Sequence, residues 1–384
     1  MMQPKRERKK YPLLPYSQLV WDMMQADKNV YTFASKARVK NEAGRAERIT
    51  EALKTALGNH PVFSMRVDDK GMQFYQPADD ILHGQFHSVD IEEKGDYIEL
   101  TITSNRILGD GISGILVMED LLRAYQGLPL EKDDYIEYLE QTEQAKQTER
   151  YAADKQWLEA KFDRLTAPVH PTPDYPLTCA QGWEEGLLTD DWSDIQDAAQ
   201  ETSREYMVTL TGIVSLAAAL ATMDYNGTDE AALTWAYDGR ETPAEQRIYG
   251  SLHRDIPLCI SRERKTKNKE QKRSLLKQVR TEMRQGIVHS AYPYTLTRPH
   301  TLIWNYALNV LQQPILIETL LQMPFEVELM EDSKHTAYSL LDVEIYAGES
   351  LSIAYRYSAT HYKQKSIQRF AAMVKENAEW LLTD

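Results

Sequence analysis

The sequence lacks the features that mark secreted, zinc-binding and membrane-spanning proteins. Its two cysteines, Cys179 and Cys259, lie far apart, which excludes a dense disulfide framework and a paired-cysteine zinc site. No run of about 18 apolar residues occurs, so we expect no membrane-spanning helix. The basic start, MMQPKRERKK, is not followed by an apolar segment and is therefore not a secretory signal. These absences favour a cytoplasmic protein.

Positive charge is also scarce. Lysine and arginine number 44 against 58 aspartates and glutamates, a net charge of 44 − 58 = −14. This balance excludes broad nucleic-acid binding, because phosphate contacts need clustered cations. The sequence also contains no GxSxG elbow, Walker A loop, GxGxxG loop or HExxH motif.

What the chain does have is enough length and apolar content for two domains. It contains 384 residues, 42% of them hydrophobic. Four prolines between residues 166 and 178 stop any helix or central strand from running through that stretch. We therefore predict a disordered basic tail over 1–11, an N-terminal lobe over 12–165, a proline-rich connector over 166–178 and a C-terminal lobe over 179–384.

Hydrophobic periodicity indicates interspersed helices and strands. Helical spacing predicts helices over residues 46–57, 112–122, 209–223, 263–284 and 367–381, with a charged helical segment over 135–162. Alternation and β-propensity predict strands over 60–67, 97–104, 231–238, 251–260 and 301–308, and a hairpin over 339–358. This order is typical of an α/β or α+β protein with mixed sheets.

One loop stands out because a predicted strand leads into it and a predicted helix leaves it. It runs from Arg106 to Gly111, and either Asp110 or Ser113 could cap the helix that follows. Loops held between rigid elements often carry reactive groups. The residues alone leave two interpretations open, a reactive loop or an ordinary strand-to-helix turn with an aspartate cap.

This loop is one of eight segments that follow one another in a known order. The others are Leu14–Trp21, the helix that ends in His60-Pro61 with Arg66, Gly71 with Gln73, Ala153–Leu158, Gly239-Arg240 with Tyr249–Leu258, His289–Tyr294 with Ile303–Tyr306, and residues 338–382. Over about residues 12–382 the chain therefore resembles the condensation domains of nonribosomal peptide synthetases, in the superfamily that includes chloramphenicol acetyltransferase. The family's central motif, His-His-x-x-x-Asp-Gly, corresponds to residues 105–111.

The resemblance implies a fold and a set of site residues. The implied α/β fold has two chloramphenicol-acetyltransferase-like lobes, which form a V-shaped pseudo-dimer with a central tunnel. Asp110 would pair with Arg240 as a structural ion pair, with Gly111 beside it. The implied tunnel-lining residues are Gln18, Asn305 and Tyr306.

The resemblance also implies the kind of substrate and partner. The implied substrates are phosphopantetheine-linked or CoA thioesters, with no bound cofactor or metal. A carrier protein, a synthetase or a tailoring enzyme is the expected partner, and nucleic acid and membrane are not. We expect a monomer.

The motif departs from the family at both histidines. Asn105 stands at the first position and Arg106 at the second. Arginine has no acceptor and does not deprotonate at working pH, so Arg106 cannot be a general base. An arginine at this position is similar to the family's X domains, which recruit oxygenases. We therefore predict a binding or recruiting domain without standard peptide-bond-forming activity.

An active acyltransferase remains the alternative. It would move an acyl group from a carrier or CoA thioester to an amine or hydroxyl, helped by proximity or by a histidine such as His289 or His300. The basic stretch from Arg262 to Lys277 is likewise open to two interpretations, a solvated helix face or a docking patch for an acidic partner.

Overall fold

The computed structural model describes residues 9–25, 31–163, 167–177, 183–263, 267–293, 308–313, 326–330, 336–337 and 339–383. The predictions made for Cys179, His300, Asn305 and Tyr306, and for most of the 301–308 strand, lie outside these residues. The chain divides into two compact units. Unit 1 comprises Met1–Thr148, Asp238–His253 and Pro314–Ser333, and unit 2 comprises Glu149–Tyr237, Arg254–Gln313 and Lys334–Asp384.

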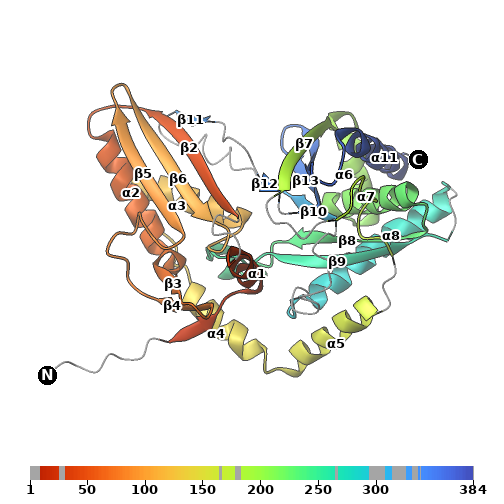
Figure 1. The fold of residues 1–384 in the computed structure, drawn as a ribbon, viewed down its shortest axis with the longest axis horizontal. Helices are drawn as coiled ribbons and strands as arrows, with labels where there is room; N and C mark the ends of the chain where they lie inside the picture. Colours follow the sequence, from red (N-terminus) through yellow and green to blue (C-terminus); the bar gives the residue numbers. More distant parts are fainter. Residues whose placement is uncertain are drawn as a thin grey trace. The chain divides into compact units, whose positions relative to one another are not determined.

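Unit 1 contains a four-stranded sheet of order β11-β2-β6-β5 and a three-stranded sheet of order β1-β4-β3, both antiparallel. Helices α2 and α3 pack beside the four-stranded sheet (Figure 1). The elements are β1 (Lys10–Pro12), α1 (Pro15–Met24), β2 (Thr32–Lys40), α2 (Arg45–Asn59), η1 (Pro61–Ser64), β3 (Met65–Val67), β4 (Met72–Tyr75), β5 (His87–Lys94), β6 (Tyr97–Asn105), α3 (Gly111–Tyr125), α4 (Tyr135–Ala145), η3 (Glu245–Arg247) and β11 (Val327–Met330).

Unit 2 is built on a seven-stranded mixed sheet of order β12-β7-β14-β13-β10-β8-β9. Strand β10 runs parallel to both β8 and β13, and the other pairs are antiparallel. The elements are α5 (Glu149–Asp163), β7 (Trp183–Asp191), η2 (Ser193–Ile195), α6 (Gln196–Tyr206), α7 (Leu210–Asn226), β8 (Glu230–Tyr237), β9 (Arg254–Ser261), α8 (Lys269–Val288), β10 (Asn309–Gln312), β12 (Thr336–Ala337), β13 (Leu341–Ala347), β14 (Leu351–Ser358) and α11 (Gln364–Leu382).

The core of unit 2 explains the most apolar segment of the sequence. Helix α7 is buried from Thr211 to Met223, and it packs with α8 and α11 against the sheet. Alternate residues of the strands, such as Val343 and Ile353, point into this core. A helix that is apolar all round needs partners on every side, and α7 has them.

Most predicted elements are confirmed. Helices α2, α3, α7 and α11, strands β6 and β8, and the β13–β14 hairpin lie where the periodicity placed them, whereas α8 begins at Lys269 instead of residue 263 and continues to Val288. The strand predicted over 60–67 is wrong in its first half, because Pro61 begins the 3-10 helix η1 and extended backbone starts only at Met65. The strand predicted over 251–260 begins instead at Arg254.

The two units do not follow the predicted domain boundaries. The first segment of unit 1 ends at Thr148, unit 1 takes up two later segments as well, and the proline-rich stretch belongs to unit 2. Its backbone is bonded there, since Ala232 N–H donates to Pro168 and Leu308 N–H to Val169. At the N-terminus, Lys10 and Tyr11 pair with β4 instead of belonging to a disordered tail. Backbone hydrogen bonding, which composition does not reveal, sets these boundaries.

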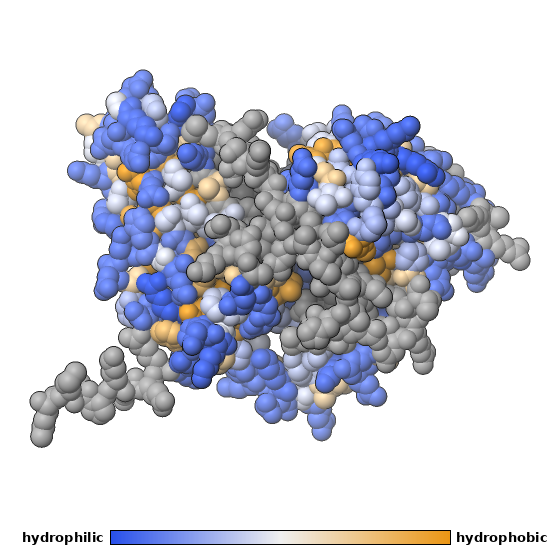
Figure 2. Space-filling model, viewed as in Figure 1, coloured by the Kyte–Doolittle hydropathy of each residue, from blue (hydrophilic) through white to orange (hydrophobic). Residues whose placement is uncertain are grey.

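The described surface is mainly polar. In the view of Figure 2, hydrophilic residues cover most of the described area, and apolar ones form small groups. Within the described ranges no single helix is long and apolar enough to cross a membrane; one bent pair, Ser193–Tyr206 with Leu210–Asn226, meets those criteria only in combination. Among the same residues, no cluster of three or more histidine, cysteine or acidic side chains could hold a metal ion.

A buried histidine at the start of β5 should make unit 1 sensitive to acid. Burial lowers the pKa of the His87 imidazole below its usual 6.5, and the ring donates to Ile81 O at 2.8 Å. Below pH 6.5 His87 therefore binds a proton in the unfolded chain, whereas in the folded chain it stays neutral until the pH reaches its lower folded-state pKa. The free energy of unfolding should fall as the pH drops from 6.5 to the lower folded-state pKa.

We expect His87→Gln to remove part of this loss, measured by urea unfolding at about pH 7.5 and about pH 5.5. His83 is the matched control, since Asp80 and Asp90 raise its pKa. Its stabilisation is present below pH 6.5 and is lost as the pH rises, so His83→Gln should shift the pH dependence in the opposite direction. Equal pH profiles for wild type and His87→Gln would contradict the assignment.

Candidate functional site

The candidate site is the loop that joins β6 to α3. Asn105 ends β6 as a buried residue whose amide donates to Thr32 Oγ1 at 2.9 Å, while its Oδ1 accepts from Ile107 N–H. Gly111 begins α3, and Asp110 and Ser113 cap it together. Each accepts from the other's backbone N–H, which is a capping box. The two capping candidates predicted from the sequence therefore act as a pair.

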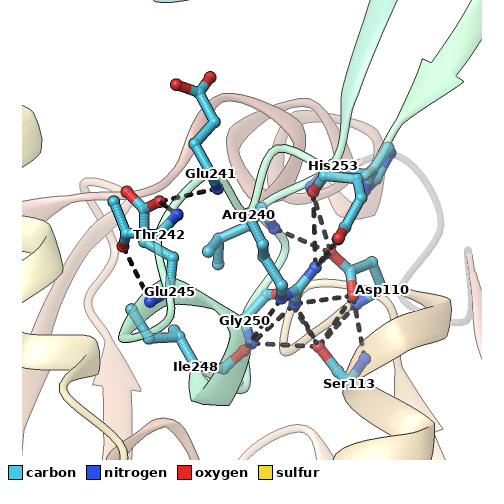
Figure 3. A network of polar contacts seen from close by, with 11 residues as sticks. Asp110, Ser113, Arg240, Glu241, Thr242, Glu245, Ile248, Gly250 and His253 are labelled. Carbon is cyan, nitrogen blue, oxygen red and sulfur yellow. Dashed lines mark hydrogen bonds and ion pairs between the residues drawn. The ribbon is translucent and has the colours of Figure 1, made fainter.

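The structure brings Asp110 and Arg240 together in a buried bidentate ion pair (Figure 3). Both guanidinium nitrogens, Nη1 and Nη2, lie 3.0 Å from a carboxylate oxygen of Asp110. Burial alone would raise the pKa of Asp110, but the charge of Arg240 and the surrounding hydrogen bonds outweigh it and hold that pKa below its usual value. The pair is therefore charged on both sides at neutral pH.

This ion pair fixes a segment that comes from far along the sequence. Asp110 Oδ2 also accepts from the backbone N–H groups of Leu252 and His253, and Arg240 donates to the carbonyls of Ile248 and Gly250. Residues 238–253 thus belong to unit 1 although their neighbours in sequence belong to unit 2.

Two glycines permit the close approach of this segment to the loop. A Cβ at Gly109 would lie 2.6 Å from the Tyr249 ring, and one at Gly250 would lie 2.8 Å from the Tyr135 ring. Distances this short do not occur for real Cβ atoms. Gly109 of the loop is therefore required for packing against Tyr249.

A second buried network holds the same segment from the other side. Asp133 accepts from His60 Nδ1 at 2.7 Å and from the backbone N–H groups of Tyr135 and Tyr249 at 2.9 Å. Asp120 accepts from Arg247 Nη2 at 2.7 Å. Both carboxylates are fully buried.

Arg106, the residue that follows Asn105 in the loop, is exposed. Its backbone N–H donates to Tyr31 O at 3.0 Å, and its guanidinium lies 6.0 Å from the centre of the Tyr31 ring. Tyr31 has a left-handed backbone with φ of 52°, a costly conformation for an aromatic residue. The loop thus places the guanidinium of Arg106 beside an aromatic ring.

The sequence analysis overlooked His253, which lies beside this loop. Its Nδ1 is 4.0 Å from Asp110 Oδ2, and its ring meets the Tyr16 ring edge-on with the centroids 4.2 Å apart. That Nδ1 is buried and makes no hydrogen bond within the described residues. No local signal in the sequence marks it, because Asp110 and His253 are far apart along the chain.

The other predicted site residues lie elsewhere. Gln18 donates to Asp22 one turn along α1, whereas Ser17, one residue earlier, donates to Ile107 O of the loop at 2.8 Å. In unit 2, His289 Nδ1 lies 2.8 Å from the buried Asp154, and its ring stacks on Trp157 at 4.4 Å. These contacts give His289 a structural place at the end of α8.

These features identify the fold class of the chain. A mixed α/β chain of two units, with a capped strand–loop–helix held by a buried aspartate–arginine pair, has the architecture of chloramphenicol-acetyltransferase-like proteins. The family follows directly, because the family model described as "Condensation domain" matches residues 85–384. The chain belongs to the condensation-domain family.

Solved structures agree on the fold. The chain is similar to the condensation domain of the monacolin K polyketide synthase MokA, with a TM-score of 0.78, 13% identity and 98% of each chain covered. It is similar to the X-domain in the complex with OxyB from teicoplanin biosynthesis, with a TM-score of 0.79 and 11% identity over 100% of this chain and 95% of that one.

A third similar structure contains a thioester. It is the starter condensation domain of rhizomide synthetase RzmA, a mutant in complex with C8-CoA, with a TM-score of 0.75 and 15% identity over 97% of this chain and 95% of that one. A comparison with curated proteins gives no match.

Proposed function

We propose that this chain is a condensation-family domain of nonribosomal peptide or related natural-product biosynthesis that binds or recruits a partner and lacks standard condensation activity. The observation that carries the proposal is the pair of residues at the two motif histidine positions. The side-chain amide of Asn105 is engaged in buried hydrogen bonds, and the guanidinium of Arg106 has no lone pair that could accept a proton. Neither can take a proton from an attacking amine, a step that a positioned base typically accelerates by about 10²- to 10⁴-fold.

The partner would be a carrier protein, a synthetase module or a tailoring enzyme. Similarity to an X-domain that forms a complex with OxyB supports a recruiting role. A thioester, on phosphopantetheine or CoA, is the ligand class that the similarity to the RzmA complex supports.

A second candidate, an active acyltransferase, is favoured by one observation. His253 lies beside the motif loop, its buried Nδ1 has no hydrogen-bond partner among the described residues, and the carboxylate of Asp110 lies 4.0 Å from that nitrogen. It would replace the motif histidine as the base that takes a proton from an amine or hydroxyl acceptor. In that case the wild-type protein would transfer the acyl group, and the His253→Ala variant would not.

The test is acyl transfer from short acyl-CoA and N-acetylcysteamine thioesters to amines, followed by mass spectrometry. We expect no product above the uncatalysed level from wild type, and at least about a tenfold gain from Arg106→His, because the new side chain supplies an acceptor nitrogen. Arg106→Gln is the matched control, since it removes the charge without adding a base. Wild-type turnover that Arg106→Ala abolishes would refute the proposal.

A further inference from the structure

Helix α8 carries its cations on one side only. Each residue is rotated by about 100° about the helix axis from the one before it, and on this measure five of the cations lie within an arc of roughly 80°. We call them the basic row: Lys269, Arg273, Lys277, Arg280 and Arg284. The adjoining arc of the helix is neutral or acidic and holds Glu270, Ser274, Gln278, Thr281, Glu282 and Gln285. A merely solvated helix face usually mixes both signs, so this segregation needs a reason.

Four of the five members of the basic row have no polar partner among the residues that the structure describes. These four, Lys269, Arg273, Lys277 and Arg284, are exposed and form no ion pair or hydrogen bond with a described residue, whereas Arg280 donates to a backbone carbonyl. Many cations elsewhere do have carboxylate partners, as expected where acidic residues outnumber basic ones 58 to 44. The row extends over about 22 Å along the helix, at a rise of about 1.5 Å per residue.

The row is narrower than the basic stretch seen in the sequence. Arg262 is neutralised by Asp224 at 2.7 Å and Asp229 at 3.2 Å. Lys272 is buried and donates to the carbonyl of Thr383. Both lie within the stretch Arg262–Lys277, and neither is available to a partner.

An apolar side chain lies next to the middle of the row. Arg280 Nη1 donates to Tyr206 O at 3.1 Å, and the next residue, Met207, is 72% exposed with a left-handed φ of 52°. An exposed methionine near a row of cations suits a protein partner better than a nucleic acid, which offers phosphates but little apolar surface.

We propose that the basic row and Met207 form the docking surface for an acidic helix of a partner protein. This inference rests on the proposed function, since a recruiting domain needs a surface that recognises its partner. The partner helix would present carboxylates at about one-turn intervals and one apolar side chain for Met207. Long-range attraction of this kind speeds association and is screened by salt.

The probe is a capped, fluorescently labelled helical peptide of about 21 residues, with glutamates along one face and one leucine, titrated with the full chain at about 20 mM salt. The row variant replaces each exposed member by glutamine: Lys269→Gln, Arg273→Gln, Lys277→Gln and Arg284→Gln. The matched control makes the same change in net charge at four exposed lysines elsewhere: Lys36→Gln, Lys40→Gln, Lys70→Gln and Lys365→Gln.

We expect binding at least about tenfold weaker in the row variant and within about twofold of wild type in the control, with a further loss for Met207→Ser that persists at high salt. No peptide binding, or an equal loss in row variant and control, would overturn the proposal. Tighter binding of a DNA duplex than of the peptide would overturn it too. The Arg106 thioester assay is independent of these residues, so a failure of the row and a failure of the proposed function are separable.

Discussion

Arg240→Ala should lower the free energy of unfolding by about 3 kcal/mol or more, because it leaves the carboxylate of Asp110 buried without its cation. The side chains of Asp110 and Arg240 are only 6% and 1% exposed. Asp110→Asn should cost a similar amount, since it removes the buried counter-charge of the guanidinium and replaces one acceptor oxygen with an NH2 donor that faces other donors. Urea unfolding at pH 7 measures both changes.

Arg240 provides its own control. Its Nη1 also contacts Asp238 at 2.6 Å, but that carboxylate is 43% exposed. Asp238→Ala should therefore cost no more than about 1 kcal/mol. The double variant Asp110→Asn with Arg240→Ala should lose less than the sum of the single losses, as expected for partners in one network. If all the single variants unfold like wild type, the pair has no structural role.

The ion pair also predicts that the folding stability falls in acid. Because the folded-state pKa of Asp110 is lowered, its contribution is present above the ordinary pKa of 3.8 and is lost as the pH falls through the folded value. Wild type should therefore lose stability more steeply than Asp110→Asn below pH 3.8.

Local periodicity predicted those elements whose burial has a helical or alternating pattern. Ile49 and Leu53 of α2, and Ile98 and Leu100 of β6, are buried as their spacing required. Strand β2 was missed, because in Thr32–Lys40 charged residues interrupt the apolar ones and its partners, β6 and β11, lie far along the chain. Pairing of this kind is set by tertiary contacts that a local window does not contain.

The candidate site shows the same division. The strand–loop–helix around Asp110 could be predicted from local signals, and its partner Arg240 came from the family resemblance. The membership of residues 238–253 in unit 1 could not be predicted from the sequence. It depends on hydrogen bonds to Asp110 and Asp133, which lie more than a hundred residues earlier in the chain. His253 was missed for that reason, since only the folded chain brings it near the loop.

Asp133→Ala should be the second strongly destabilising change, at about 3 kcal/mol. The Asp133 side chain is fully buried and accepts three hydrogen bonds, from His60 Nδ1 and the N–H groups of Tyr135 and Tyr249. Removing it leaves all three donors unsatisfied in the interior, and each such group costs about 1 kcal/mol or more. Asp133→Asn should restore part of the loss, because one amide oxygen still accepts.

The neighbouring Asp134 is the matched control for this network. Its carboxylate is 36% exposed and pairs with the exposed Lys132, so Asp134→Ala should change stability by less than about 1 kcal/mol. Because Tyr249 N–H is one of the donors, Asp133→Ala should also loosen the segment that Asp110 and Arg240 hold. Amide exchange at Tyr249–His253 should then rise more than exchange in β5 and β6. Unchanged exchange at Tyr249–His253 would show that the ion pair alone fixes the segment.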